Sequence, residues 1–398
     1  MQAADPRHSR DIQVNYTAPM AKQILILGAG FGGLELSSRL SAAVADEVQV
    51  TLIDKNDAFV FGFSKFDLMF GRATLPEVSS YYRDLVKPGV EFRQETVLSI
   101  DPGARKVTTD GGTYEPDVLV VALGADYSVD STPGFAEGGH EFYSFAGAQA
   151  LRDVLVSFTS GSVVIGIIGQ PYKCPPAPAE AAMLMDEYFV ERGIRSDVEI
   201  SLVAQWQIPV PPSPGGSAEI LERFKELNIT YIPNRVITSI DPEKKVAVYE
   251  DGDTIPYDLF LGIPVHRVPA VVEESGLAEG GWIPVDKSNL LTRFPDVYAV
   301  GDVTSAPVPK AGGFAESAAR AVADHLITQI RGDGTPAPFS GTGICYVEFG
   351  GNVVGRLDVD FFSGPNPVAP FTSPSRELAK EKAESAVAKT RRWFQAEP

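Results

Sequence analysis

The sequence predicts an α/β fold built from two Rossmann-like dinucleotide-binding domains, the first of them discontinuous, and a small C-terminal region. An apolar run at 22–27 enters a glycine-rich turn and a helix pattern, which is how such a domain begins. The same succession recurs about 140 residues later, and a strand–turn–strand pattern at 98–124 recurs at 238–264 with the same offset. A chain of 398 residues has room for two or three domains.

The first strand and helix carry the signature of a phosphate-binding loop. A Gly-x-Gly-x-x-Gly turn at 28–33 lies between the apolar strand and the helix. Its first glycine suits a tight turn, its second the close approach of a pyrophosphate, and its third the packing of helix on strand. A second strand over 48–53 ends at Asp54, which is placed to accept a hydrogen bond from a ribose hydroxyl. These features predict a bound dinucleotide. The motif glycines are Gly28, Gly30 and Gly33.

The second copy of this plan has lost two of its three glycines. Pro171 and Cys174 stand where the second and third would be, and Tyr172 and Lys173 add bulk. Proline offers no N–H group to a phosphate, so we expect no NAD in the second domain. The free N–H groups and dipole of the following helix, together with Lys173, are expected to lower the pKa of the Cys174 thiol. The alternative is a buried, inert thiol.

Two further residues are candidates for chemistry beside Cys174. Glu180 follows on the same predicted helix, and it suits general acid–base catalysis if burial raises its pKa. The alternatives are a solvated glutamate and a structural hydrogen bond. Cys345, the only other cysteine, falls in a predicted short strand after a linker at about 331–340. It is either a core residue or the resolving partner of a redox thiol.

Other stretches have more than one interpretation. The aromatic stretch 59–70 suits either contact with a flat cofactor ring or core packing, and 206–217 is a Pro/Gly-rich loop. An apolar strand ends in Gly301-Asp302, and a loop at 309–313 enters an alanine-rich helix whose N-terminus stabilises negative charge. A charged helical stretch at 376–394 is interpreted as a docking helix or a solvated tail, with an amphipathic membrane contact as the alternative.

Composition narrows the classes of partner. The formal net charge of −18 argues against nucleic acid and anionic membrane surfaces, both of which need Lys and Arg. No apolar run reaches the length of a membrane helix, and residues 1–19 have the polar composition of a disordered extension. We therefore expect a cytoplasmic protein with at most peripheral membrane contact, and a homodimer is compatible with the sequence. The four histidines lack metal-ligand spacing, so no metal is predicted.

Together these residues resemble the sulfide:quinone oxidoreductase and flavocytochrome c sulfide dehydrogenase flavoproteins, a branch of the disulfide reductase-like flavoproteins with two dinucleotide domains. The resemblance extends from residue 20 to the C-terminus. The paired cysteines are its most specific feature. The motifs that carry it are Gly28-Ala-Gly-Phe-Gly-Gly33, Ala122-Leu-Gly124, Lys173-Cys174 with Glu180, Gly301-Asp302, Pro309-Lys310-Ala-Gly312 and Cys345-Tyr-Val-Glu348.

The resemblance implies FAD in the first domain and a redox-active pair, Cys174 and Cys345, at the flavin ring. In such enzymes sulfide attacks the disulfide, one cysteine keeps a persulfide, and the other thiolate passes electrons to the flavin. Glu180 matches the acid–base glutamate of the family, and a quinone or a cytochrome accepts the electrons. Because both thiols are already assigned, we expect non-covalent FAD. The expected FAD contacts are Gly28, Gly30, Phe31, Gly33, Asp54, Lys55, Val97, Ala122, Gly124, Gly301, Asp302, Lys310 and Gly312.

The sequence also predicts where the domains begin and end, and it leaves two alternative functions. The FAD-binding domain is predicted at 20–135 and 258–335, the second domain at 136–257, and the C-terminal region with Cys345 and a terminal helix at 336–398. One alternative is a type II NADH:quinone oxidoreductase, which shares the architecture but needs a glycine-rich second loop. The other is a flavin-bearing redox sensor that only switches its disulfide.

Overall fold

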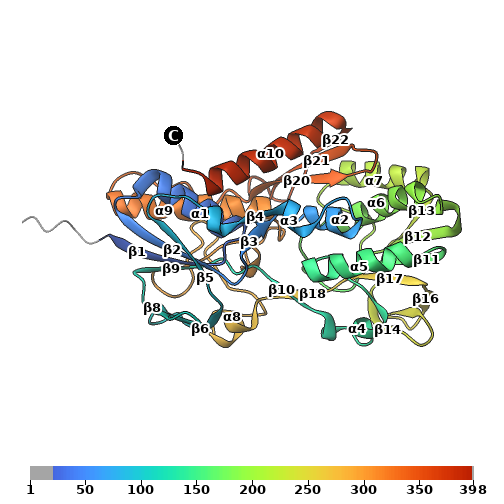
Figure 1. The fold of residues 1–398 in the computed structure, drawn as a ribbon, viewed down its shortest axis with the longest axis horizontal. Coiled ribbons are helices and arrows are strands. Elements are labelled where there is room, and N and C mark those ends of the chain that lie inside the picture. Colours follow the sequence, from blue (N-terminus) through green and yellow to red (C-terminus); the bar gives the residue numbers. More distant parts are fainter. Residues whose placement is uncertain (1–20, 397–398) are drawn as a thin grey trace, which may run out of the picture.

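Residues 21–396 are described by the computed structural model, and the predicted extension at 1–19 lies outside them. The first domain is built on a five-stranded parallel sheet with the order β19-β9-β1-β2-β5. Strands β1, β2, β5 and β9 of this sheet are labelled in Figure 1. Its central strand is buried on both sides, since Ile24–Leu27 are at most 1% exposed. The strands are β1 (Lys22–Leu27), β2 (Val48–Asp54), β5 (Val90–Gln94), β9 (Val118–Val121) and β19 (Val297–Ala299).

Different elements cover the two faces of this sheet. Helices α1 (Phe31–Val44) and α9 (Gly312–Arg331) pack against each other and against one face. A small antiparallel sheet and helix α8 (Ala270–Glu274) cover the other face. The strands of that small sheet are β6 (Val97–Asp101), β7 (Lys106–Thr109) and β8 (Thr113–Tyr114).

The second domain repeats this plan. Its four-stranded parallel sheet has the order β13-β12-β11-β17, and a second antiparallel sheet, β14-β15-β16, packs on one face. The predicted α/β class with two related halves is therefore confirmed. The strands are β11 (Gly161–Ile167), β12 (Val198–Val203), β13 (Ile229–Ile232), β14 (Ile237–Asp241), β15 (Val246–Tyr249), β16 (Thr254–Pro256) and β17 (Leu259–Ile263). The helices are α5 (Phe145–Ser157), α6 (Ala177–Glu191) and α7 (Pro214–Glu226).

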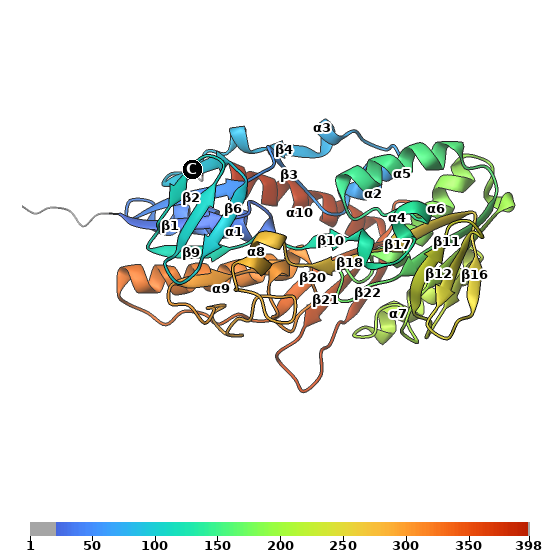
Figure 2. The ribbon, with the colours of Figure 1, turned by 90° about the horizontal axis from the view of Figure 1, so that it is seen from below.

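The chain crosses between the domains at two strands that pair antiparallel, β10 (Asp126–Ser128) and β18 (Val265–Arg267) (Figure 2). The predicted boundaries at 135/136 and 257/258 need correction. Helix α4 (Phe135–Gly138) contacts β14, and β17 pairs with β11, so both belong to the second domain. The last strand of the second repeat, β17, adds to the sheet of its own repeat. The chain therefore returns to the first domain only after β17, at β18.

The C-terminal region forms a three-stranded antiparallel sheet and one long helix. The sheet is β20-β21-β22, with β20 at Thr342–Glu348, β21 at Val354–Asp360 and β22 at Phe371–Ser375. Helix α10 (Arg376–Phe394) runs from this sheet to α1 along one side of the molecule (Figure 1). The predicted helical stretch at 376–394 is confirmed, and it docks rather than trailing in solvent.

The end of α10 is buried against the glycine-rich turn of the first domain. Trp393 is 0% exposed, and its ring lies 5.8 Å from that of Phe31, at 90°. Its indole N–H donates to Glu35 over 2.8 Å, and the Phe394 ring stacks on that of Tyr82. A hydrogen-bonded, buried tryptophan of this kind fixes the helix end firmly.

Short elements complete the described chain. They are β3 (Ala58–Val60), β4 (Ser79–Tyr81), α2 (Ser64–Met69) and α3 (Leu75–Val78), and they lie between β2 and β5 in the sequence. In the part of the chain that the structure describes, no helix has the length and apolar character needed to cross a membrane.

Candidate active site

Two glycines of the turn stand where no side chain fits, and the third leaves open space where the sequence predicts a pyrophosphate. Gly28 has φ +101°, and a Cβ there would lie 2.4 Å from the carbonyl oxygen of Ala122. A Cβ on Gly33 would lie 1.9 Å from the Gly28 carbonyl oxygen, so this glycine permits the packing of helix on strand. No atom lies within 4 Å of the Cβ position of Gly30, which leaves open space beside the N-terminus of α1.

Hydrogen bonds from two sides hold this turn in place. The backbone N–H of Ala29 donates to a carboxylate oxygen of Asp54 over 2.8 Å. The Tyr82 hydroxyl donates to the Ala29 carbonyl over 2.7 Å. The other oxygen of Asp54 accepts from the backbone and side-chain N–H groups of Asn56. The predicted ribose ligand therefore also fixes the loop, and it lines the cavity described next.

One cavity of about 1210 Å³ connects this turn with the thiols. Gly33 does not line it, in keeping with its packing role. A space of this size with a glycine cradle at one end fits a dinucleotide. The predicted residues that line the cavity are Gly28, Gly30, Phe31, Asp54, Lys55, Val97, Ala122, Gly124, Cys174, Glu180, Gly301, Asp302, Lys310, Gly312 and Cys345.

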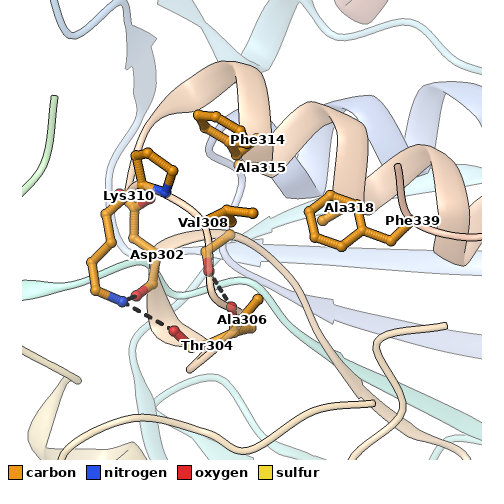
Figure 3. A pocket seen from close by; sticks show the side chains of 11 residues that line it. Asp302, Thr304, Ala306, Val308, Lys310, Phe314, Ala315, Ala318 and Phe339 are labelled. Carbon is orange, nitrogen blue, oxygen red and sulfur yellow. Dashed lines mark hydrogen bonds between the residues drawn. The ribbon is translucent and has the colours of Figure 1, made fainter. Parts of the chain in front are cut away.

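Lys310 is held by the loop that leads into α9. Its ammonium group donates to the carbonyl oxygens of Asp302 and Thr304 over 2.6 and 3.0 Å (Figure 3). It also lies 3.3 Å from the centroid of the Trp282 ring. Burial lowers the pKa of Lys310 to about 8. The side chain thus organises the loop that carries Gly312, where a Cβ would lie 2.7 Å from the Phe31 ring.

The backbone brings Cys174 to the boundary between the domains. The N–H of Cys174 donates to the Lys310 carbonyl over 2.8 Å, and Cys174 itself has φ +52°. This conformation is uncommon for a residue with a side chain and is typical of functional sites. Cys345 lies on β20, opposite Leu357 of β21. Both cysteines are free thiols, and both line the same cavity.

Glu180 lies in the first turn of α6 and is 3% exposed. One of its carboxylate oxygens accepts the backbone N–H of Glu348, the last residue of β20, over 3.0 Å. Burial raises the pKa of Glu180 to about 7. The carboxyl group therefore exchanges protons near neutral pH, as general acid–base catalysis requires.

The expected low pKa of the Cys174 thiol is wrong. Burial raises the pKa of Cys174 well above its ordinary value, with added repulsion from Glu180 and Cys345, and it raises that of Cys345 to about 12. Helix α6 begins only at Ala177, and the ammonium group of Lys173 donates instead to Ala125 and Tyr127. Desolvation therefore outweighs the helix dipole here.

Comparison with known proteins places this architecture in a family. The model of the pyridine nucleotide-disulphide oxidoreductase family matches residues 22–324, which include both parallel sheets. The chain belongs to the pyridine nucleotide-disulphide oxidoreductase family. Membership makes the protein an oxidoreductase and implies a flavin, FAD, as its cofactor, which agrees with the glycine cradle.

Within this family the chain is similar to sulfide-oxidising relatives. It is 28% identical to the sulfide-quinone reductase of Aquifex aeolicus, over 88% of this chain and 85% of the relative. It is 26% identical to the mitochondrial sulfide:quinone oxidoreductase of Mus musculus, over 91% and 83%. The crystal structure of the A. aeolicus sulfide:quinone oxidoreductase superposes with a TM-score of 0.83 at 25% identity, covering 94% and 92%. The resemblance inferred from sequence is confirmed.

The site also contains residues that the sequence analysis of this family member missed. Lys382 and Lys389 of α10 both line the cavity, as do Tyr127 and Tyr143 near Cys174. The two lysines are seven residues apart, which places them on one side of a helix, so helical periodicity offered a signal. The tyrosines lie outside the glycine and cysteine motifs, and no local pattern identified them.

Proposed function

We propose that the protein is an FAD-dependent oxidoreductase that oxidises sulfide, or a related small sulfur compound, through Cys174 and Cys345. Electrons pass to a quinone, with a cytochrome as the alternative acceptor. The observation that carries the proposal is a single cavity lined by both thiols, a buried glutamate and the glycine cradle. Similarity to the sulfide-quinone reductase of A. aeolicus and the sulfide:quinone oxidoreductase of M. musculus supports sulfide as donor and quinone as acceptor.

The first domain supplies the cofactor site. Gly30 leaves space for the pyrophosphate at the N-terminus of α1, and Asp54 is the ribose ligand. FAD, when bound, supplies a two-electron acceptor. We propose non-covalent binding, because the chain has two cysteines and both are assigned to the redox pair.

The chain's own chemistry is the opening of a disulfide between Cys174 and Cys345. Attack by hydrosulfide forms a new S–S bond, which leaves a persulfide on one cysteine, and breaks the bond between the cysteines, which releases the other as a thiolate. The sulfide sulfur thereby loses two electrons, which the released thiolate holds, and bound FAD would accept them. Burial raises the pKa of both thiols, so the released thiolate readily binds a proton. Glu180 is the group that gives the thiolate this proton and takes it back.

The second domain lacks the features that an NADH oxidase needs. Pro171 offers no N–H group to a phosphate. Tyr172 is only 4% exposed, and its ring packs against that of Trp206 from the Pro/Gly-rich loop at 206–217. The absence of NAD from this domain is part of the proposal, and it weighs against a type II NADH:quinone oxidoreductase. A cytoplasmic location, at most peripheral membrane contact and a homodimer stay predictions.

Anaerobic titration of the purified yellow protein tests the proposal. Sulfide is expected to bleach the flavin, and NADH is expected to leave it oxidised. Bleaching by NADH and not by sulfide would favour the type II alternative. Steady-state turnover with sulfide and a soluble quinone separates an enzyme from a redox sensor, because a sensor is reduced once and stops.

A further inference from the structure

Glu180 contacts the backbone of a residue whose side chain belongs to an ion pair in the C-terminal region. Its carboxylate accepts the backbone N–H of Glu348 over 3.0 Å. The side chain of Glu348 forms an ion pair with Lys382 of α10, and Arg72 lies 3.7 Å from its other oxygen. The side chains of Glu348 and Lys382 are only 17% and 11% exposed. A row of ionisable groups therefore leads from the buried glutamate to the surface.

Burial makes this ion pair unusual as a purely structural feature. Two charges removed from water cost several kcal/mol in desolvation, and an apolar pair of similar volume packs as well or better. The ammonium group of Lys382 lies 4.4 Å from the centroid of the Phe63 ring, and Lys382 lines the cavity that holds Glu180 and both thiols. The pair is therefore placed where its charges act on the reacting groups.

The two charges act on Glu180 in opposite directions. Lys382 lowers the pKa of Glu180 and the Glu348 carboxylate raises it, against the larger effect of burial. Within residues 21–396, three more titratable groups interact electrostatically with Glu180, and each is neutral when its thiol or hydroxyl is protonated. Those groups are Cys174 before α6, Cys345 on β20 and Tyr143 before α5. On α6 itself, Asp186 pairs with Arg195, and Glu187 accepts the N–H of Gly351.

We propose that Glu348 and Lys382 are positioning residues that set the protonation state of Glu180, and so tune proton transfer at the thiol pair. Glu348 orients the carboxylate through its backbone, and the two side chains balance its charge. Arg72 and Asp67, which pair over 3.0 Å, complete the route to solvent. The inference rests on the proposed function only for its catalytic consequence, because the electrostatic effect exists without substrate.

The test is an infrared pH titration of the carboxylic acid band of Glu180, on the full-length protein with FAD bound and no sulfide added. The band is assigned by its loss in Glu180→Gln. Lys382→Met is expected to raise the titration midpoint by roughly one pH unit or more, and Glu348→Gln to lower it by a similar amount. General loosening of the fold would move both midpoints in the same direction, so opposite shifts separate a tuning role from a structural one.

A matched control is available in the same two parts of the chain. Glu381 of α10 pairs with Arg356 of β21 over 2.9 Å, and neither residue lines the cavity, so Glu381→Gln is expected to leave the midpoint unchanged. Lys382→Arg keeps the charge and is expected to restore it. Equal shifts in the control, or the same sign in both test variants, would overturn the inference. If the opposite shifts appear while sulfide fails to bleach the flavin, the proposed function fails and the tuning role stands.

Discussion

The raised pKa of Glu180 makes a quantitative prediction about stability. Between pH 4.5, the ordinary pKa of the group, and pH 7, its pKa in the folded protein, the folded state retains a proton that the unfolded chain has released. Stability is therefore fully present below pH 4.5 and is lost as the pH rises through 7. A shift of this size corresponds to about 3 kcal/mol when each pKa unit is worth about 1.4 kcal/mol.

The substitution Glu180→Gln removes this loss, because the amide oxygen still accepts the Glu348 N–H and carries no charge. We expect the variant to match the parent within about 1 kcal/mol at pH 5 and to exceed its stability by about 3 kcal/mol at pH 8. Urea denaturation of both proteins over this pH range measures the difference, and the other titrating groups cancel in it.

Glu187→Gln is the matched control for this prediction. Glu187 lies on the same helix and also accepts a backbone N–H, that of Gly351 over 2.9 Å, but it is partly exposed. Its substitution on the same helix is measured beside Glu180→Gln at each pH, as the reference for the change of a carboxylate that accepts one N–H group. A constant difference between Glu180→Gln and the parent would refute the assignment of Glu180 as a buried group that titrates near neutrality.

Three further predictions test the site. Trp393→Ala should cost about 3–5 kcal/mol of stability and weaken FAD binding. Trp206→Ala is the control and should leave FAD binding unchanged. Equilibrium dialysis with FAD measures both, and an equal loss of FAD affinity in the two variants would contradict the specific role of α10. Cys174→Ser and Cys345→Ser should each retain FAD and lose sulfide-driven bleaching in stopped-flow absorbance, and normal bleaching in either would remove the thiol pair from the mechanism. Gly28→Ala should purify without flavin, because its Cβ would lie 2.4 Å from a carbonyl oxygen, and a yellow variant would show that the turn adapts.

The fold was predictable because its signals are local and repeated. Each signal extends over a few residues: the apolar run at 22–27, the glycine turn and the duplicated strand–turn–strand pattern. The structure contains them as β1, the start of α1, and the two small antiparallel sheets β6-β7-β8 and β14-β15-β16. The domain crossing was predicted less well, because the partner of β17 is decided by a strand about 100 residues away in the sequence.

The position of the candidate residues in one cavity was predictable, and their electrostatics were not. Cys174, Cys345 and Glu180 could be picked out by type and spacing, and all three line one cavity. The pKa of Cys174 could not be predicted, since a helix start favours the thiolate and burial opposes it, and the sequence gives no measure of burial. Lys382 was missed for a similar reason, because its role depends on how α10 docks.

The docking of α10 has a consequence for the order in which the protein matures. The glycine turn leaves the ribosome before α10, whose aromatic side chains Trp393 and Phe394 support it. During translation, domains that form early wait for any segment that is still being made. We therefore expect nascent chains that end before residue 393 to capture FAD poorly, so that loading of the flavin is completed only after synthesis of α10.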